Sequence, residues 1–244
     1  NPGDCVLLIY PPSLDFLPAF LGCLYAGVVA VPLAPLNIAS LTETDLAKFN
    51  HVISDCGATV ALTTSSYKRM FSLAAAKVSL TRSSVKLLKL SWIGLDLLSD
   101  KKAAAASAKF PESKIAGHGA DTALAYLQYS SGSTGNPKGV MVTHRTALQE
   151  LFLLVTRFRW HSKRVHMWVP HWHDLGLVAA ILGSIVSYEE TYLMSPLQFL
   201  SNPMISLKII SEKRVTLTCM NNFALEHIVK KYASLERQGG APSF

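Results

Sequence analysis

Short apolar runs alternate with segments of helical spacing along most of this chain, and this alternation constrains its fold more than any other feature. The apolar runs predict strands at residues 5–10, 28–33, 58–64, 124–129, 140–142, 164–170, 191–194 and 215–220. Helices are predicted at residues 14–27, 42–56, 144–157, 175–187, 203–213 and 222–235. Strands joined through helices of this length pair in parallel. The chain is therefore predicted to be α/β, with mostly parallel sheets flanked by helices on both faces.

Two of the predicted helices have recognisable boundaries. Ser13 is placed to cap the first helix, and Gly27 to end it. Gly57 follows the last turn of the second helix, which carries four apolar residues on one side: Leu46, Phe49, Val52 and Ile53. This side is expected to face the core.

The composition is that of a folded protein, because half of the 244 residues are hydrophobic and 16% are charged. The run from Phe16 to Leu36 is long enough to suggest a membrane span, but Pro18, Pro32 and Gly27 interrupt it. A buried helix followed by a buried strand is predicted instead. Four scattered cysteines without a CxxC pair indicate buried free thiols. With no signal-peptide pattern, a cytoplasmic protein without an integral membrane segment is expected.

Positive charge is concentrated in one part of the chain. The net charge is +7, and the stretch from Tyr67 to Lys114 accounts for it, with ten Lys and Arg against three Asp and Glu. Such a stretch indicates either a surface for an anionic partner or a solvated connection. Aromatic residues do not alternate with the basic ones here, as they do in nucleic-acid platforms. A variable basic connection over residues 67–114 is predicted, and no nucleic-acid partner.

The segment SSGSTGNPKG, residues 130–139, has the composition of a phosphate-binding loop. Its glycines allow successive backbone N–H groups to point into one concavity, and its hydroxyls and Lys138 add further donors. It is not a Walker A motif, because Lys138 follows a proline and a strand, not a helix, comes next. The alternative is an ordinary solvated hairpin turn, since Gly, Ser and Asn-Pro are common turn formers.

A second polar segment, WVPHWHDLGL at residues 168–177, follows a predicted strand and precedes a predicted buried helix. Ligands of open α/β sheets bind beyond the carboxyl ends of strands, so a binding site is expected here. Three interpretations remain open. Three histidines with Asp174 could bind a metal, namely His166, His171 and His173. Asp174 could instead cap the helix with His173 paired to it, or the turn could contact a substrate.

The SSGSTGNPKG loop between two strands resembles the phosphate-binding signature of the adenylate-forming, AMP-binding superfamily. Three further segments, HDLGL, SPLQFLSNP and MNNFALEH, are similar to segments of its fatty acyl-AMP ligases and occur in the same order. The resemblance implies that residues 1–244 are part of the large N-terminal domain of such an enzyme, truncated at both ends. It is weakest between Tyr67 and Gly119.

The resemblance also implies a reaction, in which a fatty acid carboxylate attacks the α-phosphate of ATP to give acyl-adenylate and pyrophosphate. ATP and Mg²⁺ are the implied cofactors, with Thr134 near the metal. The implied phosphate-binding residues are Ser130, Ser131, Gly132, Ser133, Thr134, Gly135, Lys138 and Gly139. Those that contact the fatty acid are His173, Asp174, Gly176, Asn222 and Phe223. Thr134, Lys138 and His173 are the implied catalytic residues.

The implied partner is an acyl carrier protein or a polyketide or non-ribosomal synthase module. Two rival functions remain, a long-chain acyl-CoA synthetase and a non-catalytic adenylation-fold module that binds acyl or nucleotide ligands. The family's adenine-binding Glu segment, its ribose-binding Asp region and its C-terminal catalytic Lys do not follow Phe223. The 244 residues alone are therefore predicted to be inactive, and the intact protein active.

Overall fold

The computed structural model of the chain describes residues 1–80, 88–96, 122–130, 135–160 and 163–240. The chain divides into two compact units, Asn1–Ala147 and Leu148–Phe244.

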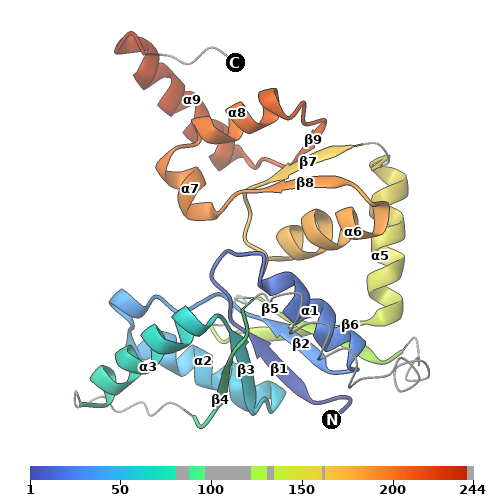
Figure 1. Ribbon diagram of the computed structural model, residues 1–244, viewed down its shortest axis with the longest axis vertical. Coiled ribbons are helices and arrows are strands. Elements are labelled where there is room, and N and C mark those ends of the chain that lie inside the picture. Colours follow the sequence, from blue (N-terminus) through green and yellow to red (C-terminus); the bar gives the residue numbers. More distant parts are fainter. Residues whose placement is uncertain (81–87, 97–121, 131–134, 161–162, 241–244) are drawn as a thin grey trace. The chain divides into compact units, whose positions relative to one another are not determined.

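The first unit is built on a six-stranded sheet with strand order β4-β3-β1-β2-β5-β6 (Figure 1). All neighbouring strands pair in parallel except β5 and β6, which form an antiparallel hairpin. The strands are β1 (Cys5–Leu8), β2 (Val29–Pro32), β3 (Val60–Thr63), β4 (Ser91–Gly94), β5 (Leu124–Ser130) and β6 (Lys138–Thr143). The prediction of a mostly parallel sheet is confirmed.

Helices cover both faces of this sheet because successive side chains of each strand point to opposite sides. On one face, Leu7 and Ile9 pack in a cluster with α2 (Glu43–Cys56) and α3 (Ser65–Leu80). On the other face, the ring of Tyr10 meets Phe16 of α1 (Phe16–Tyr25) at a centroid distance of 6.2 Å. A short 3₁₀ turn, η1 (Ile38–Ser40), lies between β2 and α2 in the chain. The run from Phe16 to Leu36 thus contains a helix followed by a buried strand, as predicted, but the helix is buried on one side only, since Leu21 and Tyr25 are exposed.

Helix α2 has the boundaries and the buried side that its sequence predicts. The four apolar residues at helical spacing are all buried: Leu46, Phe49, Val52 and Ile53. Thr42 caps the first turn by accepting from the backbone N–H of Asp45, whose carboxylate accepts from the backbone N–H of Thr42 in return. Gly57 ends the helix in the left-handed conformation, at φ 65°. The predicted start of α1 is less accurate. The hydroxyl of Ser13 accepts from the backbone N–H of Asp15 in a turn before the helix, and α1 begins at Phe16.

Two regular elements lie within the basic stretch that was expected to be only a connection. They are the greater part of α3 and the edge strand β4, neither of which the sequence analysis predicted. Trp92 of β4 contacts Phe71 of α3 at 4.4 Å between ring centroids and Phe49 of α2 at 6.3 Å. Aromatic packing against α2 and α3 therefore holds a four-residue strand whose sequence pattern is too short to identify by itself. Of the remaining stretch, residues 81–87 and 97–114 lie outside the described residues.

The second unit contains a three-stranded parallel sheet with order β8-β7-β9. The strands are β7 (Arg164–Met167), β8 (Glu190–Leu193) and β9 (Leu217–Thr218). Val165 and Met167 of β7 pack against η3 on one face, while His166 points to α8 on the other. Helix α5 (His144–Arg157) begins in the first unit and continues into the second. The other helices of the second unit are η3 (Leu175–Leu182), α6 (Gly183–Ser187), α7 (Pro196–Ser201), α8 (Met204–Glu212) and α9 (Asn222–Arg237).

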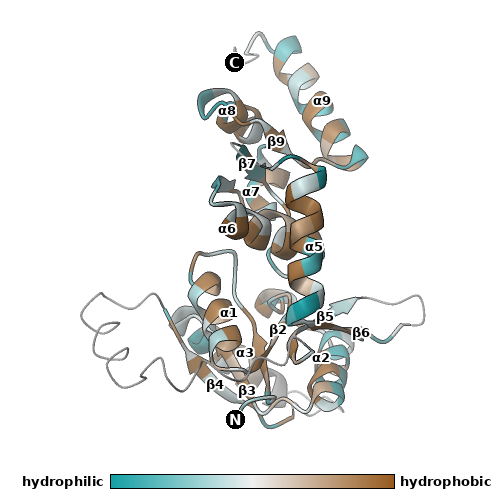
Figure 2. Ribbon diagram, turned by 90° about the vertical axis from the view of Figure 1, so that its right-hand side faces the viewer, coloured by the Kyte–Doolittle hydropathy of each residue, from teal (hydrophilic) through white to brown (hydrophobic). Residues whose placement is uncertain are grey.

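The predicted helix over residues 175–187 is a π-helix, η3, that continues as the α-helix α6. The N–H of Gly183 bonds the carbonyl of Val178, five residues earlier, instead of four. Helix α7 was not predicted, although Ser195 and Gln198 form a capping box at its start. Helix α5, which was predicted with its observed ends, is amphipathic, and its apolar and polar bands alternate along it in Figure 2.

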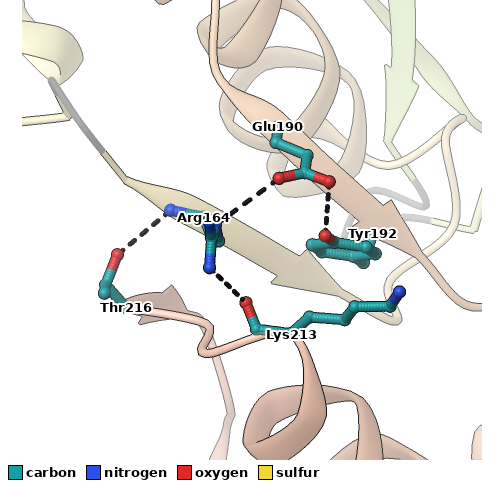
Figure 3. A network of polar contacts seen from close by, with 5 residues as sticks. All are labelled: Arg164, Glu190, Tyr192, Lys213 and Thr216. Atoms are coloured by element: carbon teal, nitrogen blue, oxygen red, sulfur yellow. Dashed lines mark hydrogen bonds and ion pairs between the residues drawn. The ribbon is translucent and has the colours of Figure 1, made fainter.

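A polar network joins the strands of the second sheet at their start (Figure 3). Arg164 forms an ion pair of 3.5 Å with Glu190, and its guanidinium donates to the carbonyl of Lys213 at 3.2 Å. The Tyr192 hydroxyl donates to the other oxygen of Glu190, and the Lys213 ammonium lies 5.7 Å from the Tyr192 ring centre. Because both members of the ion pair are about half exposed, the network sets strand positions more than it adds stability.

Among the described residues, no helix is both long and apolar enough to cross a bilayer. All four cysteines are free thiols. Cys23 is buried, and Cys5 and Cys56 are partly buried, but Cys219 is exposed. The expectation of buried thiols is therefore wrong for Cys219, which follows the last residue of a two-residue strand.

Candidate functional site

The β5–β6 hairpin carries the glycine- and serine-rich loop of residues 130–139. Ser130 pairs with Lys138, and Tyr129 with Gly139, so both ends of the loop are fixed by the antiparallel register. Gly135 adopts φ +96°, a conformation that favours glycine, and the position of a Cβ there is open space. Lys138 and Ser130 are exposed. Ser131, Gly132, Ser133 and Thr134 lie outside the described residues, so their predicted roles remain predictions.

Helix α2 contacts both arms of this loop. The ring nitrogen Nε2 of His51 lies 3.2 Å from the carbonyl oxygen of Pro137. The hydroxyl of Tyr129 donates to the carboxylate of Asp55 at 2.5 Å. Sequence reasoning missed both residues, and the available signal was weak, because a polar pair at i and i+4 on the outer side of a helix is common.

Tyr129 fits in this arrangement because residue 139 is a glycine. A Cβ at position 139 would come within 3.0 Å of the Tyr129 ring. Burial and the hydrogen bond to Asp55 both raise the pKa of Tyr129, so its hydroxyl remains a donor at neutral pH. Gly139, which was predicted to bind phosphate, therefore also has a packing role beside Tyr129.

The turn of His173 and Asp174 lies between β7 and η3 in the second unit. Asp174 caps η3 by accepting from the backbone N–H of Leu175 at 2.6 Å. The His173 ring nitrogen Nδ1 lies 2.5 Å from the Asp174 carboxylate, and both side chains are largely exposed. The capping interpretation of Asp174 is confirmed. Because Asp174 contacts Nδ1 of His173, the Nε2 edge of that exposed imidazole remains available for a ligand.

Gly176 allows η3 to begin directly against the end of the preceding segment. A Cβ at this position would lie 2.0 Å from the carbonyl oxygen of Pro170 and 2.7 Å from its carbonyl carbon. The N–H of His173 donates to the same Pro170 oxygen at 3.1 Å, which tightens the turn. Any side chain at 176 would push the turn out of place, so Gly176 shapes the position of His173 through the backbone.

His166 belongs to the interior and not to this turn. Its Nδ1 lies 3.0 Å from the carbonyl oxygen of Tyr192, and its Nε2 lies 2.6 Å from the hydroxyl of Ser206. Because a carbonyl can only accept, Nδ1 carries the proton and the neutral ring accepts from Ser206 at Nε2. Burial lowers the pKa of His166 and favours this neutral form. Both ring nitrogens are therefore engaged, which contradicts the metal interpretation for His166.

Asn222 and Phe223 begin α9. Asn221, and not Asn222, is the capping residue, since its side chain accepts from the N–H of Ala224 at 2.9 Å. Phe223 is half exposed and stacks on His227 at 6.0 Å between ring centroids. His227 in turn lies 5.9 Å from Phe199, which stacks on the buried Trp168 at 4.2 Å. Phe223 thus ends a series of aromatic contacts that runs from the core to the surface of the second unit.

The donors of the loop fit a polyphosphate. A lysine ammonium, a serine hydroxyl and the open backbone around Gly135 are groups that bind phosphate oxygens. In the described part of the chain no three His, Cys, Asp or Glu residues are grouped to hold a metal ion. Mg²⁺ that arrives with a nucleotide needs few protein ligands, because phosphate oxygens and water supply most of its coordination.

Comparison with known proteins agrees with these features. The family model described as AMP-binding enzyme matches residues 1–242. The chain is 38% identical over 237 residues to the medium-chain-fatty-acid–[acyl-carrier-protein] ligase JamA of Moorena producens, covering 96% of this chain and 38% of that protein. It is 29% identical over 233 residues to the long-chain-fatty-acid–AMP ligase FadD32 of Mycolicibacterium smegmatis, covering 93% of this chain and 34% of that protein.

Among solved structures, the fatty acyl-adenylate ligase from L. pneumophila in complex with acyl adenylate and pyrophosphate has a TM-score of 0.76 and 33% sequence identity. The similarity covers 94% of this chain and 37% of that one. The chain thus spans less than two fifths of the length of these relatives. From the family match over nearly all of its length, and from the mostly parallel sheet whose β5–β6 hairpin carries the loop, the chain belongs to the AMP-binding enzyme family.

Proposed function

We propose that the protein carrying this chain activates a fatty acid with ATP to form acyl-adenylate, releasing pyrophosphate. The similarity to JamA over 96% of the chain carries this proposal, since that relative is a fatty-acid ligase and is the more similar of the two sequences compared. The L. pneumophila ligase, whose structure holds acyl adenylate and pyrophosphate, supports the same reaction. In that reaction a carboxylate oxygen bonds to the α-phosphorus while the bond to pyrophosphate breaks.

The proposed role of the loop is to bind the β- and γ-phosphates. Both substrates are anions, so catalysis depends on charge neutralisation and on holding the reacting oxygens in line. Lys138 supplies a positive charge at the start of β6, and the other proposed phosphate contacts are Ser130, Ser131, Gly132, Ser133, Thr134, Gly135 and Gly139. Thr134 is proposed as a Mg²⁺ contact because a hydroxyl oxygen is a hard ligand.

The proposed role of the His173 turn is to contact the fatty acid carboxylate. Asp174 orients the imidazole through its contact with Nδ1, and Gly176 sets the turn by its close approach to Pro170. Asn222 and Phe223 are proposed to line the acyl site, with the half-exposed Phe223 ring offering apolar surface.

The proposed acceptor of the acyl group is an acyl carrier protein, either free or within a polyketide or non-ribosomal synthase. The name of JamA, an acyl-carrier-protein ligase, favours this acceptor over coenzyme A. We further propose that residues 1–244 are part of a larger adenylation domain, with 67–114 as a variable basic connection within it. The fold over 94% of this chain matches 37% of the L. pneumophila ligase, which supports the first of these statements.

The test uses the complete natural protein, incubated with ATP, Mg²⁺ and fatty acids of several chain lengths. Fatty-acid-dependent exchange of pyrophosphate into ATP is expected, with acyl-AMP accumulating in the absence of an acceptor. Added carrier protein should consume the acyl-AMP, and coenzyme A should not. Formation of acyl-CoA would support the synthetase instead, and ligand binding without exchange would support the non-catalytic module.

A further inference from the structure

Two side chains of α2 contact the two arms of the β5–β6 loop. His51 and Asp55 are four residues apart, so they lie one turn from each other on the same side of the helix. His51 contacts Pro137, next to Lys138, and Asp55 accepts from Tyr129, next to Ser130. The paired strand residues Ser130 and Lys138 therefore each lie beside a residue that is fixed to the same helix.

We propose that His51 and Asp55 are positioning residues, which hold the two arms of the loop in the geometry that binds the polyphosphate of ATP. This inference rests on the function proposed above. His51 and Asp55 act on the ligand indirectly, through the described arms Tyr129–Ser130 and Gly135–Gly139, because neither side chain is placed among the phosphate contacts.

The contacts have defined donors. The Pro137 carbonyl can only accept, so the hydrogen bond requires a proton on Nε2 of His51. The Tyr129 hydroxyl donates to a carboxylate, which makes that bond the stronger of the two. Gly139 leaves the space that the Tyr129 ring occupies while it makes this bond.

Helix α2 is a suitable base for the loop because its opposite side is part of the core. Phe49, Val52 and Ile53 are each 4% exposed and pack in the main cluster of the first unit. A hairpin loop attached to such a helix loses less conformational entropy on binding a ligand than one fixed by its strands alone. Because less entropy is lost, the contacts of His51 and Asp55 are expected to raise the affinity for nucleotide. The stability of the first unit is expected to depend instead on the buried side of α2.

The test measures ATP affinity by calorimetry, without fatty acid, in the complete natural protein. His51→Ala and Tyr129→Phe are each expected to weaken ATP binding about fivefold, which corresponds to the loss of one hydrogen bond. His51→Gln should restore most of the affinity, because its side-chain amide N–H can donate to the same carbonyl. Ser54→Ala, at an exposed position of the same helix, is the matched control and should bind ATP as the wild type does.

A melting curve of each variant separates positioning from stability. The inference predicts that the melting temperatures of His51→Ala and His51→Gln agree while their ATP affinities differ. It is overturned if both variants bind ATP as tightly as the wild type, or if both lose affinity and melting temperature together. A wild-type protein that binds ATP but forms no acyl-adenylate would contradict the proposed function and leave this comparison intact.

Discussion

Replacement of Gly176 by alanine should destabilise the second unit more than any other glycine-to-alanine change in that unit's described residues. The new Cβ would lie 2.0 Å from the Pro170 oxygen, whereas real Cβ contacts are essentially never shorter than 3.0 Å. The start of η3 must therefore move away from the turn by about 1 Å, against a contact atom that belongs to the backbone and cannot rotate aside. We expect a loss of about 3 kcal/mol in the free energy of unfolding, at the upper end of the range for overpacked sites.

The assay is urea denaturation of the complete natural protein, followed by the fluorescence of tryptophan, since three of the four tryptophans of this chain, Trp160, Trp168 and Trp172, belong to the second unit. Gly183→Ala is the matched control. Gly183 lies in the same helical run and is also buried, but its new Cβ would be 3.4 Å from the nearest atom, an ordinary contact. The control should be neutral or stabilising by about 0.5–1 kcal/mol. If the two variants unfold at the same urea concentration, the close approach of η3 to Pro170 does not exist as described.

Three further predictions concern other parts of the chain. Because burial holds the pKa of His166 below its ordinary value of 6.5, the unfolded state binds the proton more readily, and stability should fall as the pH drops below about 6.5. His166→Gln should remove that part of the pH dependence, so the difference in unfolding free energy between wild type and variant should change as the pH falls. A difference that stays the same at every pH would contradict this prediction. Thr42→Ala should lower the free energy of unfolding by about 1 kcal/mol, measured by thermal unfolding, because it removes the α2 cap, while Thr44→Ala, two residues later, should not. Lys138→Ala should lower pyrophosphate exchange about tenfold or more without lowering the melting temperature, and normal exchange would exclude Lys138 from the phosphate site.

The fold class and several element boundaries could be predicted because their signals are local. In α2, four apolar residues at helical spacing and a final Gly57 specify one helix and its buried side. Edge strand β4 could not be predicted in this way. Its four residues are held by Trp92 packing against Phe71 and Phe49, and such contacts exist only after the chain has folded.

In the candidate site, too, only the features that depend on neighbouring residues could be predicted from the sequence. Residue types and their order were sufficient to predict a phosphate-binding loop at residues 130–139, because glycines, hydroxyls and a lysine in one turn can together bind phosphate oxygens. The attachment of that loop to His51 and Asp55 joins residues 86 and 74 positions apart in the chain, so no local pattern indicates it.

The sequence by itself determined the alternation of strands and helices, the polar loop and the family resemblance, since each depends on residues close together in the chain. Only the tertiary structure decided that His166 faces the interior, that Gly176 must lack a side chain and that α2 supports the loop. Each of these depends on atoms brought together from separate segments, where burial and contact distance set the energy of a group.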